Sequence, residues 1–408
     1  MADRAGRLNA WVADHFLVAA VIFVAWTALA FAHLLVPHHL VTSDGHLIDA
    51  STVQRGGYNV WAYRNLAYSD IYRLYAERGL FGHPLPYLHT AIEYPVVTGL
   101  FIWAASLAPG VQAYFLVSAI GLLVAGLLAL RLLRDLIPES YHFFALTPLL
   151  LVYSLLNWEL LGIFLLVLGW WFVRRDRWAA GGVAFALGTF AKLFPAIAVP
   201  FLAAELVRRR QPRKLAGAAV AFVVTSLVVN LPFALLGWHN WTFFIRFNTT
   251  RSVSGLLSLT SNVAVADGLE ALVVLGAIAV GVRAVLRGGS PERAAAFAFA
   301  AFLLVNKVYS PQYLLWLLVM ALIAGWPGWT MLLLSIAGLV DYFGTFGGLY
   351  LTNASTAQSV SSRRIADLLD VVVPLFRYGG IALSTLGTAL RSRLRPVTAA
   401  GEGKLEAA

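Results

Sequence analysis

The sequence predicts an all-α integral membrane protein that crosses the membrane many times. Of its 408 residues, 60% are hydrophobic and only 12% are charged, and the mean hydropathy is +0.76. Soluble domains are about 45–50% apolar and about 25% charged. A soluble fold of this length also has too little interior to bury so much apolar surface. Because apolar runs follow one another along nearly the whole chain, we expect one transmembrane domain over residues 1–408.

Apolar runs predict about 11 to 12 membrane-spanning helices. They lie near residues 16–36, 95–108, 112–130, 143–157, 159–173, 178–207 (a hairpin), 215–237, 268–286, 294–306, 312–325, 328–343 and 367–390. If every run between residues 94 and 175 crossed once, Arg174 would lie on the wrong side of the membrane. Either one of these runs is a re-entrant or half-length segment, or one crossing is missed. The short polar tail, 396–408, is expected to be disordered.

The formal charge of +10 indicates topology rather than a nucleic-acid partner. Most of the basic residues gather in short segments between apolar runs, as the positive-inside rule expects of cytoplasmic loops. The opposite, outer face then carries four longer polar segments, at residues 37–94, 238–267, 306–311 and 344–366. We therefore expect a multi-pass plasma-membrane protein with its functional residues on the outer (periplasmic) face. The absence of cysteine excludes disulfides, thiolate metal sites and a cysteine nucleophile.

The first outer segment, 37–94, is expected to carry functional residues, because such long loops are uncommon unless they are functional. Within it, residues 69–79 predict a short amphipathic helix at the membrane interface, with Ser69 as its N-cap and Gly79 as the glycine that ends it. Asp70 is a candidate general base, since a carboxylate close to a hydroxyl can take its proton. The alternative is a helix-capping aspartate paired with Arg73. Glu93, at the next membrane boundary, is either a helix-start acid or a ligand for sugar hydroxyls.

Three ionisable residues lie in or beside apolar runs: Glu159, Lys192 and Lys307. A charge at the centre of a membrane costs roughly 2.5–3.5 kcal/mol or more, so each is either functional or reaches to the interface. A lysine facing the outer side could hold a phosphate and stabilise it as a leaving group. A further outer cluster contains His239 and Arg251, among aromatic residues that could equally form an interfacial belt. The histidine spacings match no metal motif, so neither a metal nor another cofactor is indicated, although a divalent metal stays possible.

Several short motifs occur together in a fixed order along the chain. They are Tyr68-Ser69-Asp70-Ile71, Arg78-Gly79-Leu80, Pro86-Tyr87, Glu93-Tyr94-Pro95-Val96-Val97-Thr98-Gly99, Lys192-Leu193-Phe194-Pro195 and Asn306-Lys307-Val308-Tyr309-Ser310-Pro311-Gln312-Tyr313-Leu314-Leu315-Trp316. In this order, on a polytopic chain, they resemble actinobacterial members of glycosyltransferase family 87. That family belongs to the GT-C superfamily of integral membrane glycosyltransferases.

The resemblance implies an inverting glycosyl transfer on the outer side of the plasma membrane. The donor would be a β-linked polyprenyl-phosphate sugar, most often mannose, and the acceptor a hydroxyl of a cell-envelope glycolipid or lipoglycan. The family's catalytic aspartate would fall on Asp70, and its phosphate-contacting role on Lys307. Asp70 lies further beyond the first span than in the mannoside-elaborating members, which leaves Asp44 and Asp49 as rivals. The implied partners are the donor, the acceptor and membrane lipids, with no nucleic acid.

These observations define an expected site. Asp70 is the expected base, and Lys307, Lys192 and Arg251 are expected to bind the donor phosphate. The expected substrate contacts are Glu93, Tyr94, Arg73, Glu159, His239, Gln312 and Tyr313. The competing interpretation is a transporter or flippase of lipid-linked sugars, which predicts functional charges at mid-membrane and two-fold internal similarity; no such repeat is detected. A purely structural subunit would leave segment 37–94 unexplained.

Overall fold

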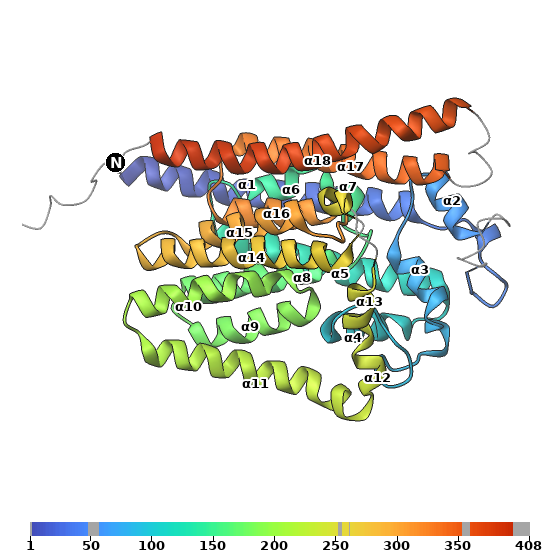
Figure 1. The fold of residues 1–408 in the computed structure, drawn as a ribbon, viewed down its shortest axis with the longest axis horizontal. Coiled ribbons are helices and arrows are strands. Elements are labelled where there is room, and N and C mark those ends of the chain that lie inside the picture. Colours follow the sequence, from blue (N-terminus) through green and yellow to red (C-terminus); the bar gives the residue numbers. More distant parts are fainter. Residues whose placement is uncertain (1, 48–56, 252–254, 261, 353–359, 395–408) are drawn as a thin grey trace, which may run out of the picture.

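The computed structural model describes residues 2–47, 57–251, 255–260, 262–352 and 360–394 (Figure 1). Within these ranges the chain is helical and forms only isolated β-bridges, such as Val41 with Leu47. The prediction of an all-α protein is therefore confirmed. Two parts of the sequence prediction lie outside the described residues: Asp49 and the tail 396–408.

Among the described residues, five helices are long and apolar enough to cross a membrane. They are α1 (Ala2–Leu34, apolar from His15), α5 (Gly110–Leu136), α11 (Pro212–Leu236), α14 (Val263–Leu286) and α17 (Gly328–Thr352). Helix α11 has no buried residue, and its Val228 and Leu235 are 69% and 74% exposed. A continuous apolar surface of this kind suits lipid rather than water. The chain is therefore a polytopic membrane protein.

The remaining apolar runs form shorter helices. These are α4 (Val96–Ser106), α6 (His142–Leu146), α7 (Leu149–Tyr153), α8 (Glu159–Arg174), α9 (Trp178–Ala191), η4 (Phe194–Ala198), α10 (Val199–Arg208), α15 (Pro291–Val305) and α16 (Tyr313–Ile323). Helix α16 is buried from Leu314 to Leu322, so it lies inside the bundle. The predicted run 143–157 breaks at Pro148, which has no N–H to donate. The irregular stretch that follows is buried in protein, where its backbone finds partners.

The bundle has two chemically different ends (Figure 1). One, here called the basic end, carries the start of α1, the α10–α11 and α14–α15 turns and the end of α18 (Val360–Leu394). Arg208–Arg210 and Arg287 lie in these turns. The other, here called the loop end, carries the first polar segment together with α12 (Trp238–Trp241) and α13 (Phe243–Thr249). This separation agrees with the charge distribution expected from the sequence.

Helix α4 begins and ends at the loop end. The residues before and after it both contact the first polar segment: Tyr94 precedes α4, and Val111 N, just after it, donates to Gly45 O at 2.9 Å. Trp103 Nε1, within α4, donates to His83 O at 3.3 Å. Of the two explanations that the charge pattern left open between residues 94 and 175, these contacts favour a half-length run, which is α4, and α5 starts at the loop end.

Most of the segment predicted as an outer loop at 344–366 is helical. Helix α17 extends to Thr352 and α18 begins at Val360. The two helices pack against each other, and Arg377 Nε donates to Asp341 Oδ2 at 2.8 Å between them. Such polar residues also explain why α18 is not among the five strongly apolar helices. Likewise, α12, α13 and η5 (Gly255–Leu259) occupy much of segment 238–267.

Cysteine labelling tests the position of α4, because the chain has no cysteine of its own. We expect a membrane-impermeant maleimide to label Leu107→Cys, at the end of α4, from the same side of the membrane as His239→Cys on α12. Pro212→Cys, at the basic end, should be labelled only from the other side. If Leu107→Cys instead behaves like Pro212→Cys in sided membrane vesicles, α4 crosses the membrane and the assignment is wrong.

Candidate functional site

Asp70 is the first residue of a short helix that is anchored to the irregular stretch after α7. The predicted helix at 69–79 is confirmed as α3 (Asp70–Glu77), with the Ser69 hydroxyl accepting from Ile71 N at 3.3 Å and Gly79 at φ +60° after its end. The Ser69 hydroxyl donates to Leu155 O at 2.7 Å, and Asp70 N donates to Leu156 O at 2.8 Å. The start of α3 is thereby fixed in space.

The Asp70 carboxylate is held by neutral donors. Tyr68 donates its hydroxyl to Oδ1 at 2.7 Å, and Asn157 Nδ2 donates to Oδ2 at 2.8 Å. The Tyr94 hydroxyl lies 3.3 Å from the same Oδ2. No lysine or arginine forms an ion pair with Asp70 in the described part of the chain. The carboxylate is therefore oriented without being neutralised.

Arg73 does not pair with Asp70, which was the alternative left open by the sequence. Its Nε donates to Glu77 Oε1 at 2.6 Å, and its NH1 donates to the Tyr68 hydroxyl oxygen at 3.0 Å. Burial, reinforced by the nearby negative charge of Asp70, raises the pKa of Tyr68 well above its usual value. Tyr68 therefore keeps its proton and remains a hydrogen-bond donor to Asp70.

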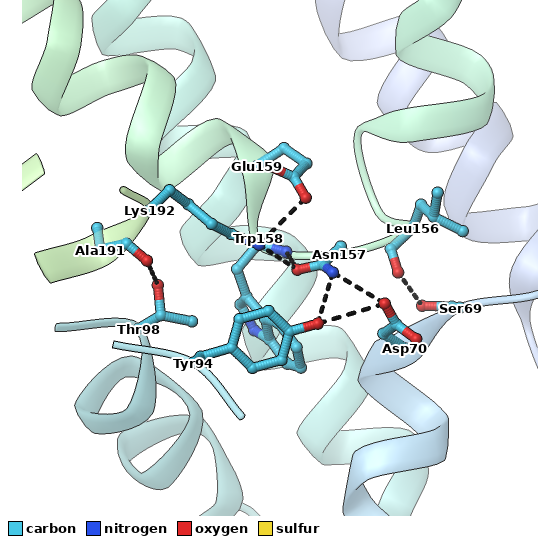
Figure 2. Close-up of polar contacts among 10 residues, drawn as sticks. All are labelled: Ser69, Asp70, Tyr94, Thr98, Leu156, Asn157, Trp158, Glu159, Ala191 and Lys192. Carbon is cyan, nitrogen blue, oxygen red and sulfur yellow. Dashed lines mark hydrogen bonds and ion pairs between the residues drawn. The ribbon is translucent and has the colours of Figure 1, made fainter. Parts of the chain in front are cut away.

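A buried chain of polar groups continues from Asp70 into the bundle (Figure 2). Lys192 Nζ donates to Asn157 Oδ1 at 2.7 Å and pairs with Glu159 Oε1 at 3.1 Å. It also lies 4.4 Å from the centre of the Tyr94 ring. Because Lys192 occupies the amide oxygen of Asn157, the amide nitrogen is left to face Asp70. Each of these groups thus sets the orientation of the next.

Local sequence explains how Lys192 reaches this position. Helix α9 ends at Ala191, and Lys192 adopts an extended conformation at φ −148°, with Pro195 starting a new turn in η4. Gly162 on α8 leaves room for the lysine stem, since a Cβ at that position would lie 2.9 Å from Lys192 Cβ. The proline and the glycine together let a charged side chain enter an apolar bundle.

The chain encloses a cavity of about 890 Å³ toward the loop end. Ten of the residues expected in the site line it: Asp70, Arg73, Glu93, Tyr94, Glu159, Lys192, Arg251, Lys307, Gln312 and Tyr313. His239 does not; it is exposed on α12. Asp44, the rival for the base, is also outside the cavity, in a turn where its carboxylate accepts from Thr42.

The cations around the cavity differ in how they are paired. Lys307 Nζ binds Asp267 Oδ1 at 2.6 Å, and Arg78 Nε binds Glu93 Oε2 at 2.8 Å. Arg251 forms no ion pair with any described residue, and its guanidinium lies 5.7 Å from the centre of the Phe247 ring. Arg251 is therefore the cavity cation that an incoming anion reaches without displacing a carboxylate.

One wall of the cavity is apolar and is formed by η4, α10, α14 and α15. Its residues are Ile197 and Pro200 from η4 and α10, Val274 and Ile278 from α14, and Phe299 and Phe302 from α15. A cavity with charged groups on one side and aliphatic and aromatic groups on another suits an amphiphile. Among the described residues, no three histidine, aspartate or glutamate side chains are placed to hold a metal ion.

The sequence pattern of glycosyltransferase family 87 matches residues 92–311, more than half of the chain. The chain belongs to glycosyltransferase family 87. This membership makes it a membrane glycosyltransferase, and the amphiphilic cavity is its candidate active site. No curated protein matches the chain.

The family match covers only part of the candidate site. Glu93, Asn157, Glu159, Lys192 and Lys307 all lie within residues 92–311 of this family 87 glycosyltransferase, whereas Asp70 precedes them. The importance of Asp70 therefore depends on its position in the cavity.

Sequence reasoning missed several polar residues of the family 87 cavity, notably Asn157, Glu270 and Trp316. The one sequence feature that indicated Asn157 is its polar amide at the end of an apolar run, just before Glu159. Glu270 Oε2 accepts from the backbone N of Lys307 at 3.0 Å and so anchors the turn after α15. A lone acid or tryptophan in an apolar run does not reveal such partners.

Removing Lys192 should destabilise the protein, because it leaves the buried Glu159 carboxylate without its cation. We expect Lys192→Met to lower the free energy of unfolding by about 3–5 kcal/mol, measured by thermal or denaturant unfolding in detergent. The matched control is Lys214→Met, which breaks a more exposed pair with Asp176 and should cost about 0–1 kcal/mol. Equal losses for the two variants would contradict a structural role for the buried pair.

Proposed function

We propose that this family 87 glycosyltransferase transfers a sugar, most often mannose, from a polyprenyl-phosphate donor to a hydroxyl of a cell-envelope glycolipid or lipoglycan. The transfer inverts the anomeric configuration, so that a β-linked donor yields an α-linked product. The reaction takes place on the outer face of the plasma membrane. The observation that carries this proposal is the Asp70 carboxylate, oriented in the cavity by neutral donors.

Asp70 suits the role of general base. A base must offer a lone pair to the proton that it removes, within hydrogen-bond reach. Tyr68, Asn157 and Tyr94 orient the carboxylate, and no described cation competes for its charge. A sugar hydroxyl of the acceptor can donate to it from the cavity.

The donor side of the cavity suits a lipid-linked phosphate. Arg251, whose guanidinium forms no ion pair with any described residue, can bind the phosphate, and Lys307 can join it if the phosphate displaces Asp267. The apolar wall formed by α10, α14 and α15 offers a surface for the hydrocarbon chain. Lys192 is already bound to Asn157 and Glu159, so we assign it to positioning rather than to the phosphate.

The reaction needs one base and no covalent intermediate. The acceptor oxygen attacks the anomeric carbon and forms the new C–O bond while the bond from that carbon to the phosphate oxygen breaks. The hydroxyl proton passes to Asp70, and the phosphate leaves with the bonding electron pair. Arg251 and Lys307 stabilise the charge that grows on the leaving phosphate.

The two ends of the bundle support the proposed location of the reaction. The basic turns occupy one end and the cavity lies toward the other. Because basic turns face the cytoplasm in most membrane proteins, the cavity then faces outward. A lipid-linked donor is available there without a soluble nucleotide sugar.

Replacing the base should abolish transfer. We expect Asp70→Asn to lower kcat by about 10²–10⁴-fold, the usual contribution of general acid–base catalysis, in an assay with polyprenyl-phosphate mannose and a lipid acceptor. Asp44→Asn is the matched control and should keep wild-type activity, because Asp44 lies outside the cavity. Full activity of a folded Asp70→Asn protein would remove Asp70 from the base role. If the wild type turns over no polyprenyl-phosphate sugar, a transporter of such lipids becomes the better interpretation.

Replacing Arg251 should weaken donor binding. A hydrogen bond to a charged group contributes about 1.5–3 kcal/mol, so we expect Arg251→Gln to raise the KM for the donor roughly 10- to 100-fold. Arg246→Gln on α13 is the matched control, since the Arg246 guanidinium donates to His239 O on α12 and Arg246 lies outside the cavity. An unchanged donor KM for Arg251→Gln would assign the phosphate to another cation.

A further inference from the structure

Two buried polar atoms at the cavity wall have no hydrogen-bond partner among the described residues. They are Oε2 of Glu159, a residue that is 0% exposed, and Nε1 of Trp316, a residue that is 6% exposed. Both residues line the cavity. Buried polar groups are nearly always paired, and leaving one unpaired costs about 1–3 kcal/mol. Two such atoms on one cavity wall point to a ligand.

The two atoms are complementary to a single hydroxyl group. A carboxylate oxygen only accepts hydrogen bonds and an indole N–H only donates, whereas a hydroxyl does both. The Trp316 indole and the Glu159 carboxyl approach each other closely, but their contact does not reach hydrogen-bond geometry, so both atoms remain open to a ligand. One hydroxyl placed there can donate to Glu159 and accept from Trp316.

Neighbouring side chains hold both groups in place. Glu159 is fixed through its other oxygen by Lys192. The Trp316 ring stacks on Phe194 at 4.2 Å and on Tyr313 at 4.3 Å between ring centres. The directions of the open acceptor and the open donor are therefore set before a ligand arrives, which favours selective binding.

The position of these atoms indicates which substrate group they would meet. Tyr313, which stacks on Trp316, lines the same cavity as Asp70 and Arg251. A sugar joined to a phosphate at Arg251, with its anomeric carbon near Asp70, must occupy this same space. Its ring hydroxyls then face the wall that carries Glu159 and Trp316.

We propose that Glu159 and Trp316 together bind one ring hydroxyl of the donor sugar and thereby select sugars that carry it. This inference rests on the proposed function for the identity of the sugar as a donor. A site built to hydrogen-bond a hydroxyl discriminates strongly against an analogue without it, because its buried polar atoms are then left unpaired. Trp316 is thus a specificity-determining residue, and Glu159 acts both there and in positioning Lys192.

The test measures kcat/KM for a short-chain polyprenyl-phosphate mannose and for its 2-, 3-, 4- and 6-deoxy analogues. We expect the wild type to use one of these analogues at least about tenfold less efficiently than the parent donor. Trp316→Phe keeps an aromatic ring in the stack and loses only the N–H, so it should lower activity on the parent donor and lose much of this discrimination. Trp326→Phe is the matched control, because Trp326 is also a buried tryptophan with an unpaired N–H but lies outside the cavity. It should discriminate as the wild type does.

A uniform loss for Trp316→Phe on the parent donor and on all four analogues would overturn the inference, because it would indicate a purely structural role. Glu159→Gln is compared in the same way if it folds, but the result for Trp316→Phe decides whether the inference holds.

A parallel binding assay in the Asp70→Asn background separates this inference from the proposed function. If the wild type transfers no sugar, the proposed function fails. Selective weakening of one deoxy analogue, lost in the combined Asp70→Asn and Trp316→Phe protein, still supports the hydroxyl site, and equal binding of all analogues overturns it.

Discussion

The buried ion pair between Lys192 and Glu159 is the interaction on which the candidate site depends. A lone charge in an apolar interior is very costly, and a pair is tolerated only when further hydrogen bonds satisfy both partners. Asn157 accepts such a bond from Lys192 through its amide oxygen, and its amide nitrogen donates to Asp70 and orients the carboxylate. Because Glu159 starts α8 and Lys192 follows α9, the same pair that orients the base also joins two helices. Helix packing and the placement of the base are therefore coupled.

The division between long and short helices explains how a membrane protein of this size contains such a cavity. Long apolar helices such as α11 present their side chains outward, where lipid can cover them. Shorter or broken helices, such as α4, α7 and α16, and the irregular segments that connect them make up the rest of the bundle. Irregular backbone at membrane depth is tolerated where protein surrounds it. The chemistry is concentrated at these interruptions, because that is where polar groups can gather without facing lipid.

Several parts of the site could be predicted from local sequence. The capped helix at Asp70 is predictable from the sequence because capping and amphipathic spacing depend only on nearby residues. Glu159 and Lys192 stood out because charges are rare in apolar runs. The sequence does not predict the partners of these two residues. It predicts that Lys192 binds a phosphate, whereas Lys192 binds Asn157 and Glu159 in the structure. The re-entrant run was foreseen only as one of two explanations of the charge pattern, and the contacts of Val111 and Trp103 identify it as α4.

The sequence by itself determined that this protein is helical, lies in a membrane and carries its basic turns apart from its longest polar segment. These properties depend on composition and on the periodicity of neighbouring residues, which a linear sequence displays directly. The tertiary structure alone decided which charges of the described residues are paired and which of their buried atoms lack a partner. Those outcomes depend on contacts such as that between Asp70 and Asn157, which lie 87 residues apart. Only the packing of the helices brings such residues together.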